Sequence, residues 1–128
     1  MKEQKVLVSM RKPHTDNIFS ARKRVEWRKT VLPKGRHLVY ECKDGGGIGK
    51  VIGEYIVYQV RKYDRVCEIP PSVAESGFVD KKYLLKYSGG AALYAHKIII
   101  PKRYDTPRDL SEFGLTRPPQ SWCYVEDL

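Results

Sequence analysis

Residues 21–28 read Ala21-Arg22-Lys23-Arg24-Val25-Glu26-Trp27-Arg28, and the interpretation of the whole chain starts from them. Apolar and charged side chains alternate here, and successive side chains of a β-strand point to opposite faces of its sheet. The alternation therefore predicts a strand over residues 23–28 whose Val25 and Trp27 face the core. Glu26 and Arg28 then project together from the opposite face.

The charged side chains of this strand have a chemistry suited to nucleotides. A carboxylate between cations stays ionised, because neighbouring positive charge lowers its pKa, so Glu26 could accept hydrogen bonds from the amino edge of a base or orient Arg28. Arg28 offers planar paired donors for a phosphate or a base edge. Lys23 could act as a point charge or, if buried, as a base. Judged by spacing alone, a solvated strand face with ion pairs is the commoner arrangement.

Outward from this strand, the chain alternates short strands with shorter helices. Strands are expected at residues 6–10, 37–42, 50–62, 92–100 and 122–125, with a hairpin joining the second and third of these. Helices are expected at 13–20, at 81–87 after the cap Asp80, and from the cap Thr106 to Gly114. Pro70-Pro71 interrupts the sheet. Because strands dominate, the pattern predicts an α+β fold, a small mixed β-barrel with short helices on its rim.

Composition limits the classes of protein and partner. The 128 residues suit a single domain over 1–128, and no repeat, linker or low-complexity segment is seen. The 24 Lys and Arg against 15 Asp and Glu give a formal net charge of +9, which predicts attraction to polyanions such as nucleic acid. No run of about 18 apolar residues indicates a membrane span, and no signal peptide is recognised. The expected location is therefore the cytoplasm, without a membrane partner.

Several common sites are not expected from the sequence. Three cysteines at odd spacing and without a Cys-x-x-Cys pair indicate neither a disulfide framework nor a zinc knuckle. The three histidines, His14, His37 and His96, have no metal-ligand spacing. The glycine-rich residues 45–50 resemble a phosphate-binding loop but place Asp44 at the required first glycine and Val51 at the magnesium-binding hydroxyl. No metal and no cofactor is therefore expected.

The stretch at residues 21–28 resembles the signature of the ASCH domain, Gly-x-Lys-x-x-Glu-x-Arg. Lys23, Glu26 and Arg28 match the signature, while Ala21 replaces its opening glycine. Further resemblance follows in family order at residues 6–10, 49–54, 94–98, 109–114 and 117–122. The resemblance implies a PUA-like barrel with the signature residues in a cleft between the first helix and the sheet. It also implies an RNA-binding module, of the kind that regulates transcription or translation.

Other residues are expected to join this cleft. Arg11, at the end of the first strand, is assigned to ligand binding with the signature residues. Gln120 and Ser121 offer amide and hydroxyl groups that can read a base edge, although they could equally be a rigid lead into the last strand. Glu54 is a second strand carboxylate that either faces the cleft or lies on the hairpin surface. The expected ligand is single-stranded RNA, a flipped base or a nucleotide-like molecule.

An enzymatic alternative is a hydrolase of the ASCH type that acts on a modified nucleoside or on RNA. Some ASCH proteins resemble amidohydrolases that deacetylate modified cytidine with a Lys, a Thr nucleophile and a carboxylate. Lys23 matches the Lys, but Glu26 stands where the Thr falls, and Thr30 lies beyond the signature. If the chain is an enzyme, Lys23, Glu26 and Glu54 are its candidate catalytic residues. A binding module without turnover is the preferred interpretation, because no hydroxyl stands at the nucleophile position.

The family glycine at position 21 is expected to have a positive φ or a close ligand approach. Alanine is strained at positive φ, so the loop around Ala21 is expected to differ locally from the family.

Overall fold

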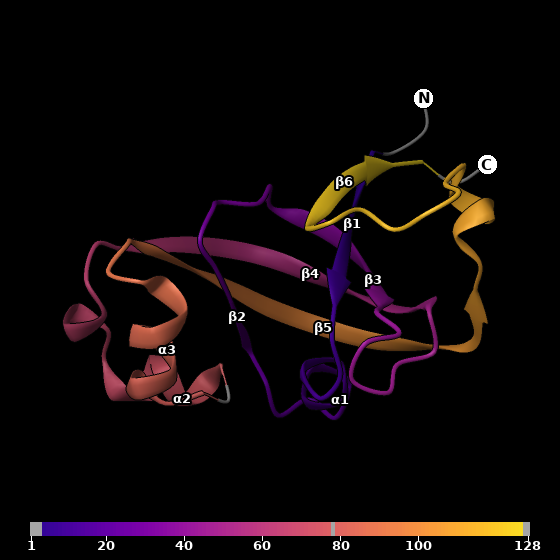
Figure 1. The fold of residues 1–128 in the computed structure, drawn as a ribbon. Coiled ribbons are helices and arrows are strands. Elements are labelled where there is room, and N and C mark those ends of the chain that lie inside the picture. Colours follow the sequence, from indigo (N-terminus) through magenta and orange to yellow (C-terminus); the bar gives the residue numbers. More distant parts are fainter. Residues whose placement is uncertain (1–3, 78, 127–128) are drawn as a thin grey trace.

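The fold is a six-stranded mixed sheet with three short α-helices, so the expected α+β class is confirmed (Figure 1). The computed structural model describes residues 4–77 and 79–126. The strands are β1 (Lys5–Met10), β2 (Val25–Arg28), β3 (Gly35–Glu41), β4 (Lys50–Tyr63), β5 (Leu93–Arg108) and β6 (Trp122–Val125). The α-helices are α1 (His14–Phe19), α2 (Pro71–Ser76) and α3 (Lys81–Ser88), and single 3-10 turns lie at Val66–Glu68 and Leu110–Phe113.

The sheet order is β2-β5-β4-β3-β1-β6. The expected hairpin is confirmed as β3 and β4, β5 pairs antiparallel with both β4 and β2, and β1 pairs parallel with β3 and antiparallel with β6. The expected closure into a barrel is not confirmed, because β2 and β6 are the two ends of this order and do not pair with each other within residues 4–77 and 79–126.

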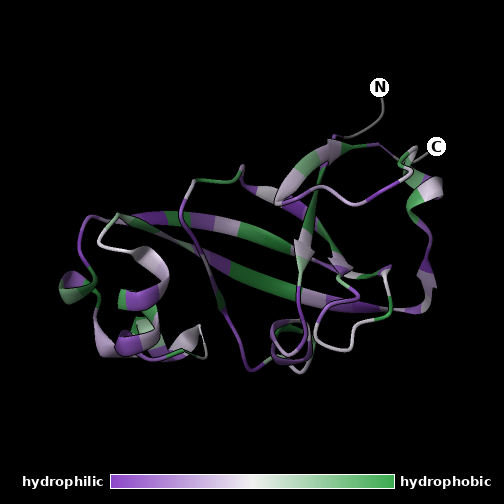
Figure 2. Cartoon of the chain, viewed as in Figure 1, coloured by the Kyte–Doolittle hydropathy of each residue, from purple (hydrophilic) through white to green (hydrophobic). Residues whose placement is uncertain are grey.

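The core has separate parts that follow the long β4–β5 pair. Figure 2 shows hydrophobic segments along the middle of both strands. One cluster lies under α1 and contains Ile18, Val39 and Ile52, all buried. A second cluster lies at the end of the sheet covered by α2 and α3, where Val25 and Trp27 of β2 pack with Leu84, as the alternation predicted. The second cluster therefore fixes β2 and leaves its other face for the polar side chains.

One local expectation is wrong, and one helix was not expected. The helix expected from Thr106 does not start there, because β5 continues to Arg108 and the final 3-10 turn begins after Asp109. Asp109 and Glu112 form the capping box, which satisfies the first main-chain N–H groups better than Thr106 would. Residues 70–71 were expected only to interrupt the sheet, but they also start α2, since proline suits the first helical turn.

Ala21 adopts a left-handed φ of 62° directly after α1. The loop therefore has the positive φ that glycine would supply, in spite of the strain expected for alanine. Within the described residues, no helix is long and apolar enough to cross a membrane.

Candidate functional site

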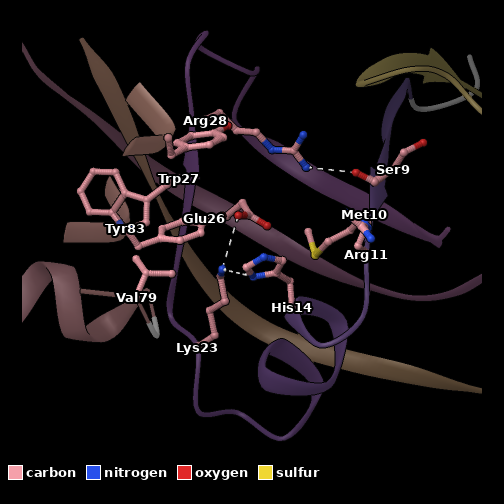
Figure 3. Close-up of a pocket in the computed structure, with 11 residues that line it drawn as sticks. Ser9, Met10, Arg11, His14, Lys23, Glu26, Trp27, Arg28, Val79 and Tyr83 are labelled. Atoms are coloured by element: carbon pink, nitrogen blue, oxygen red, sulfur yellow. Dashed lines mark hydrogen bonds and ion pairs between the residues drawn. The ribbon is translucent and has the colours of Figure 1, made fainter. Parts of the chain in front are cut away.

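A cavity of about 220 Å³ lies between the end of β1, the start of α1, strand β2 and helix α3 (Figure 3). β1 contributes Ser9 and Met10, and Arg11 follows directly. The other lining residues come from α1, the turn before β2, β2 itself, the residue before the cap of α3, and α3: His14, Lys23, Glu26, Trp27, Arg28, Val79, Tyr83 and Tyr87. Pockets for drug-sized ligands measure about 300–1,000 Å³, so this cavity suits a smaller group such as one base.

The turn between α1 and β2 places Lys23 at the cavity. With Ala21 in the left-handed conformation, the main-chain N–H groups of Arg22 and Lys23 both donate to the carbonyl of Asn17, at 3.1 and 2.9 Å. This pattern closes the end of the helix and turns the chain into β2. The Lys23 side chain is only 1% exposed, so Lys23 is buried, which is one of the two arrangements considered for it from the sequence.

Lys23 joins a histidine and a carboxylate. Its Nζ lies 3.1 Å from Nδ1 of His14 and 3.5 Å from Oε1 of Glu26 (Figure 3). An ammonium group can only donate, so Nδ1 of His14 accepts and its ring carries the proton on Nε2. The three side chains form a buried cluster of acid, base and cation, which we call the Lys23 cluster.

The cluster sets the charge of Glu26. Burial raises the pKa of the Glu26 carboxyl, but the positive charges of Lys23 and Arg28 and the hydrogen bond from Lys23 outweigh burial and leave the pKa below its ordinary value. Glu26 is therefore ionised at neutral pH although it is only 8% exposed. An ionised carboxylate is a strong hydrogen-bond acceptor and, with a lowered pKa, a weak base.

His14 is the member of the site that the sequence analysis missed. Burial, and next the charge of Lys23, lower the pKa of His14, so its ring is neutral. The histidines were considered only for metal-ligand spacing, and single histidines have no periodicity to mark them. The available signal was the position of His14 in the first turn of the helix that the resemblance places beside the signature residues.

Arg28 spans the opening between β2 and β1. Its Nη2 donates to the main-chain carbonyl of Ser9 at 3.3 Å (Figure 3). Arg11, the other cation assigned from the sequence, also lines the cavity and is exposed. The structure thus brings Lys23, Glu26, Arg28 and Arg11 together around one cavity.

Aromatic rings form the wall opposite the charged groups. Trp27 was assigned to the core, and it both packs there and lines the cavity, with its Nε1 buried and without a hydrogen-bond partner. Tyr83 and Tyr87 are stacked with ring centroids 6.0 Å apart, and Nζ of Lys29 lies 4.9 Å from the centre of the Tyr87 ring. The cavity therefore offers flat apolar surface on one side and charge on the other.

Three candidates lie outside this cavity. Gln120 and Ser121 are exposed and do not line it, although the Ser9 N–H donates to the Ser121 carbonyl at 3.0 Å and Ser9 Oγ donates to Pro119 at 2.6 Å. Glu54 accepts a hydrogen bond from the Tyr104 hydroxyl at 2.9 Å and pairs with Arg36 at 3.0 Å. Of the two expected alternatives, the hairpin surface is therefore the position of Glu54.

Within residues 4–77 and 79–126, no group of three or more His, Cys, Asp or Glu side chains is arranged to hold a metal ion. Cys42, Cys67 and Cys123 are free thiols.

Comparison with known proteins identifies the fold. No protein-family model and no curated protein sequence matches the chain. Among solved structures, the ASCH protein of Zymomonas mobilis superposes with a TM-score of 0.79 and 20% sequence identity, covering 94% of this chain and 86% of that one. Two single-residue mutants of the same protein superpose with the same TM-score at 19% identity, over 87% and 88% of their chains.

Proposed function

Starting from the fold that this chain shares with ASCH proteins, we propose that it binds single-stranded RNA, or a nucleotide-like ligand, by receiving one base in the cavity at the Lys23 cluster. The observation that carries the proposal is the ionised Glu26 carboxylate, buried beside Lys23 and Arg28 and opposite an aromatic wall. A buried charge is retained at a cost, so a binding role is the best explanation for it.

The cavity has the two features that recognise an unstacked base. Trp27, Tyr83 and Tyr87 supply flat surface against which a base can stack. Glu26 supplies an acceptor for an exocyclic amino group. A base with an amino edge would satisfy both the stacking surface and the carboxylate, whereas an apolar ligand would give Glu26 no hydrogen bond beyond its pairing with Lys23.

The cations around the cavity suit the phosphates of the same ligand. Arg11, Lys23 and Arg28 line the cavity against the single carboxylate of Glu26, and the whole chain has a net charge of +9. Arg28 retains donors beyond its bond to Ser9 and can meet a phosphate from the rim. Such a module would act in the regulation of transcription or translation, and its expected place is the cytoplasm.

A hydrolytic function receives less support from the same atoms. General base catalysis is most effective when the pKa of the base is near the working pH, and the pKa of Glu26 is lowered instead. Ser9 is the aliphatic hydroxyl in the lining, and its Oγ already donates to the Pro119 carbonyl. Neither group is placed as an activated nucleophile.

The proposal is tested by titrating the protein with a short single-stranded RNA over a series of salt concentrations. Contacts to about four to six phosphates predict a log–log slope of roughly −3 to −4. The matched variants are Glu26→Gln and Glu54→Gln, because both remove a strand carboxylate but only Glu26 lines the cavity. We expect Glu26→Gln to weaken binding and Glu54→Gln to leave it unchanged. Affinity that is flat with salt, or equal effects of the two variants, would contradict the proposal.

A further inference from the structure

A second hollow lies on the far side of Lys23 from the cavity. It consists of two adjoining parts of about 300 and 230 Å³ that share Arg24 and Tyr58 in their lining. We call it the Tyr58 groove. Lys23 lines both the groove and the cavity, so the two spaces meet at this residue.

The surface of the groove combines aromatic and apolar side chains with positive charge. Tyr58 is 50% exposed, Ile99 41% and Ile100 66%, so large apolar surface is open to solvent here. Lys23, Arg24 and Lys97 contribute to its lining, and no Asp or Glu does among the described residues. Exposed apolar surface framed by a single sign of charge is characteristic of a binding surface.

The backbone of the groove is strained at two places. Within residues 4–77 and 79–126, Ala21 and Ile100 are the only residues other than glycine with a positive φ, at 62° and 54°, and both line this groove. Ile100 lies at a bulge, where the pairing of β4 with β5 shifts register between Glu54 and Ile56. A left-handed conformation is unfavourable for a β-branched residue, and such strain concentrates at binding sites. The bulge turns the exposed Ile100 into the groove wall.

We propose that the Tyr58 groove holds the nucleotide adjacent to the one whose base enters the cavity, so that the ligand is a strand of RNA and not a free nucleotide. This inference rests on the proposed function, because it takes the cavity as the first contact. The base of the second nucleotide stacks on the exposed ring of Tyr58. Its phosphates lie between Arg24 and Lys97.

A nucleic acid fits this groove better than a protein partner. Nucleic-acid strands bind to surfaces in which aromatic rings alternate with cations, because each nucleotide brings one flat face and one negative charge. The groove offers one exposed ring with one cation, Arg24, directly before β2 and another, Lys97, on β5. The groove and the cavity share Lys23 in their lining, so adjacent nucleotides of one strand can reach both spaces.

Isothermal titration with ligands of two lengths tests the inference. The ligands are the four nucleoside 5′-monophosphates and a mixed-sequence RNA of about eight nucleotides, a length within the usual site sizes for single strands. We expect Tyr58→Ala to weaken the binding of the oligomer by about 5- to 100-fold, as the loss of one stacked base does. Binding of a monophosphate should be unchanged, because Tyr58 does not line the cavity.

Two matched variants control for surface changes. Tyr124→Ala removes an equally exposed tyrosine from β6, away from both spaces. Arg117→Ala removes the same charge as Arg24→Ala from an exposed position that lines neither space. Selective loss of oligomer affinity in Tyr58→Ala and Arg24→Ala supports the inference. If the protein binds a monophosphate as tightly as the oligomer, the proposed role of the groove is wrong but that of the cavity is not. If the protein binds neither ligand, both proposals are wrong.

Discussion

Arg28 on β2 donates a hydrogen bond to the main-chain carbonyl of Ser9 on β1, at 3.3 Å, although three strands separate β2 from β1 in the sheet. The sheet therefore curls until its first and fifth strands face each other. A side chain, and not a ladder of main-chain bonds, spans the remaining gap. The cavity lies at this gap, so Arg28 both shapes the cavity and lines it.

Two replacements of Arg28 should distinguish the contribution of its charge to RNA binding from the contribution of its planar pair of donors. Arg28→Ala should weaken RNA binding by about 1–3 kcal/mol if the guanidinium contacts a base edge. Arg28→Lys keeps the charge but loses the planar pair of donors, so its affinity should fall between those of wild type and Arg28→Ala. Equilibrium titration measures both effects, with Arg117→Ala as the control for net charge. An affinity of Arg28→Lys equal to that of wild type would show that a point charge is sufficient.

Ala21→Gly should stabilise the protein. Ala21 has a φ of 62°, which costs an L-residue roughly 1–2 kcal/mol and costs glycine almost nothing. Part of this gain is offset by the greater freedom of glycine in the unfolded chain, which leaves a net increase of about 1 kcal/mol in the free energy of unfolding. Urea denaturation measures the difference. Ala91→Gly is the matched control, because Ala91 is also exposed but has no positive φ, and it should destabilise.

His37 should make the protein acid-sensitive. Burial is the main cause that lowers the pKa of His37 from 6.5 to about 4. Since the unfolded chain binds this proton first, unfolding takes up a proton between about pH 6.5 and about pH 4, and stability falls as the pH falls through this window. The full effect is about 3 kcal/mol.

His37→Gln isolates this contribution. The glutamine amide can replace the donation from His37 Nε2 to the Pro33 carbonyl, 2.7 Å in the wild type, but it does not titrate. The free energy of unfolding, measured in urea across the pH window, should fall less steeply in the variant than in the wild type. The pKa values of His14, His96 and Glu26 are also lowered, so a slope remains in both proteins. Identical slopes would show that His37 titrates normally in the folded state.

Acetylcytidine should not be deacetylated at an appreciable rate. Glu26 occupies the position of the threonine nucleophile in the ASCH amidohydrolases that the chain resembles, and an ionised carboxylate attacks an amide poorly. The ammonium of Lys23 is engaged with His14 and Glu26, so it is not placed as a free base. The measurement is cytidine release by the purified protein. Turnover above about 1 per second that is abolished by Lys23→Ala would reject the binding-module interpretation.

The elements with regular alternation were the predictable part of the fold. The pattern at residues 23–28 located β2 and assigned Val25 and Trp27 to the core, because both consequences depend only on local geometry. α3 was also predictable, since Asp80 caps it and Gly89 ends it in the left-handed conformation. That the sheet stays open could not be predicted, because closure into a barrel depends on how far the sheet curls. No local sequence pattern indicates that curvature.

The site was predictable where its residues share one strand. Glu26 and Arg28 share β2, and Lys23 lies in the turn two residues before this strand, so their convergence follows from the local chain. Residues brought in from other elements were assigned less well. His14 and Tyr83 depend on the packing of α1 and α3, and Glu54 depends on the register between β3 and β4, which pairs it opposite Leu38 and beside Arg36.

Stability and recognition make opposite demands on Lys23 and Glu26. A buried ion pair rarely stabilises a fold more than apolar side chains of the same volume would, while loss of one partner costs about 3–5 kcal/mol. The double replacement Lys23→Met with Glu26→Leu should therefore fold at least as well as the wild type, whereas either change alone should destabilise. That double variant would keep Arg11, His14 and Arg28 at the cavity but would lack the carboxylate proposed to accept from a base. A replacement that preserves or raises the stability of the fold would therefore remove the acceptor proposed to recognise the base.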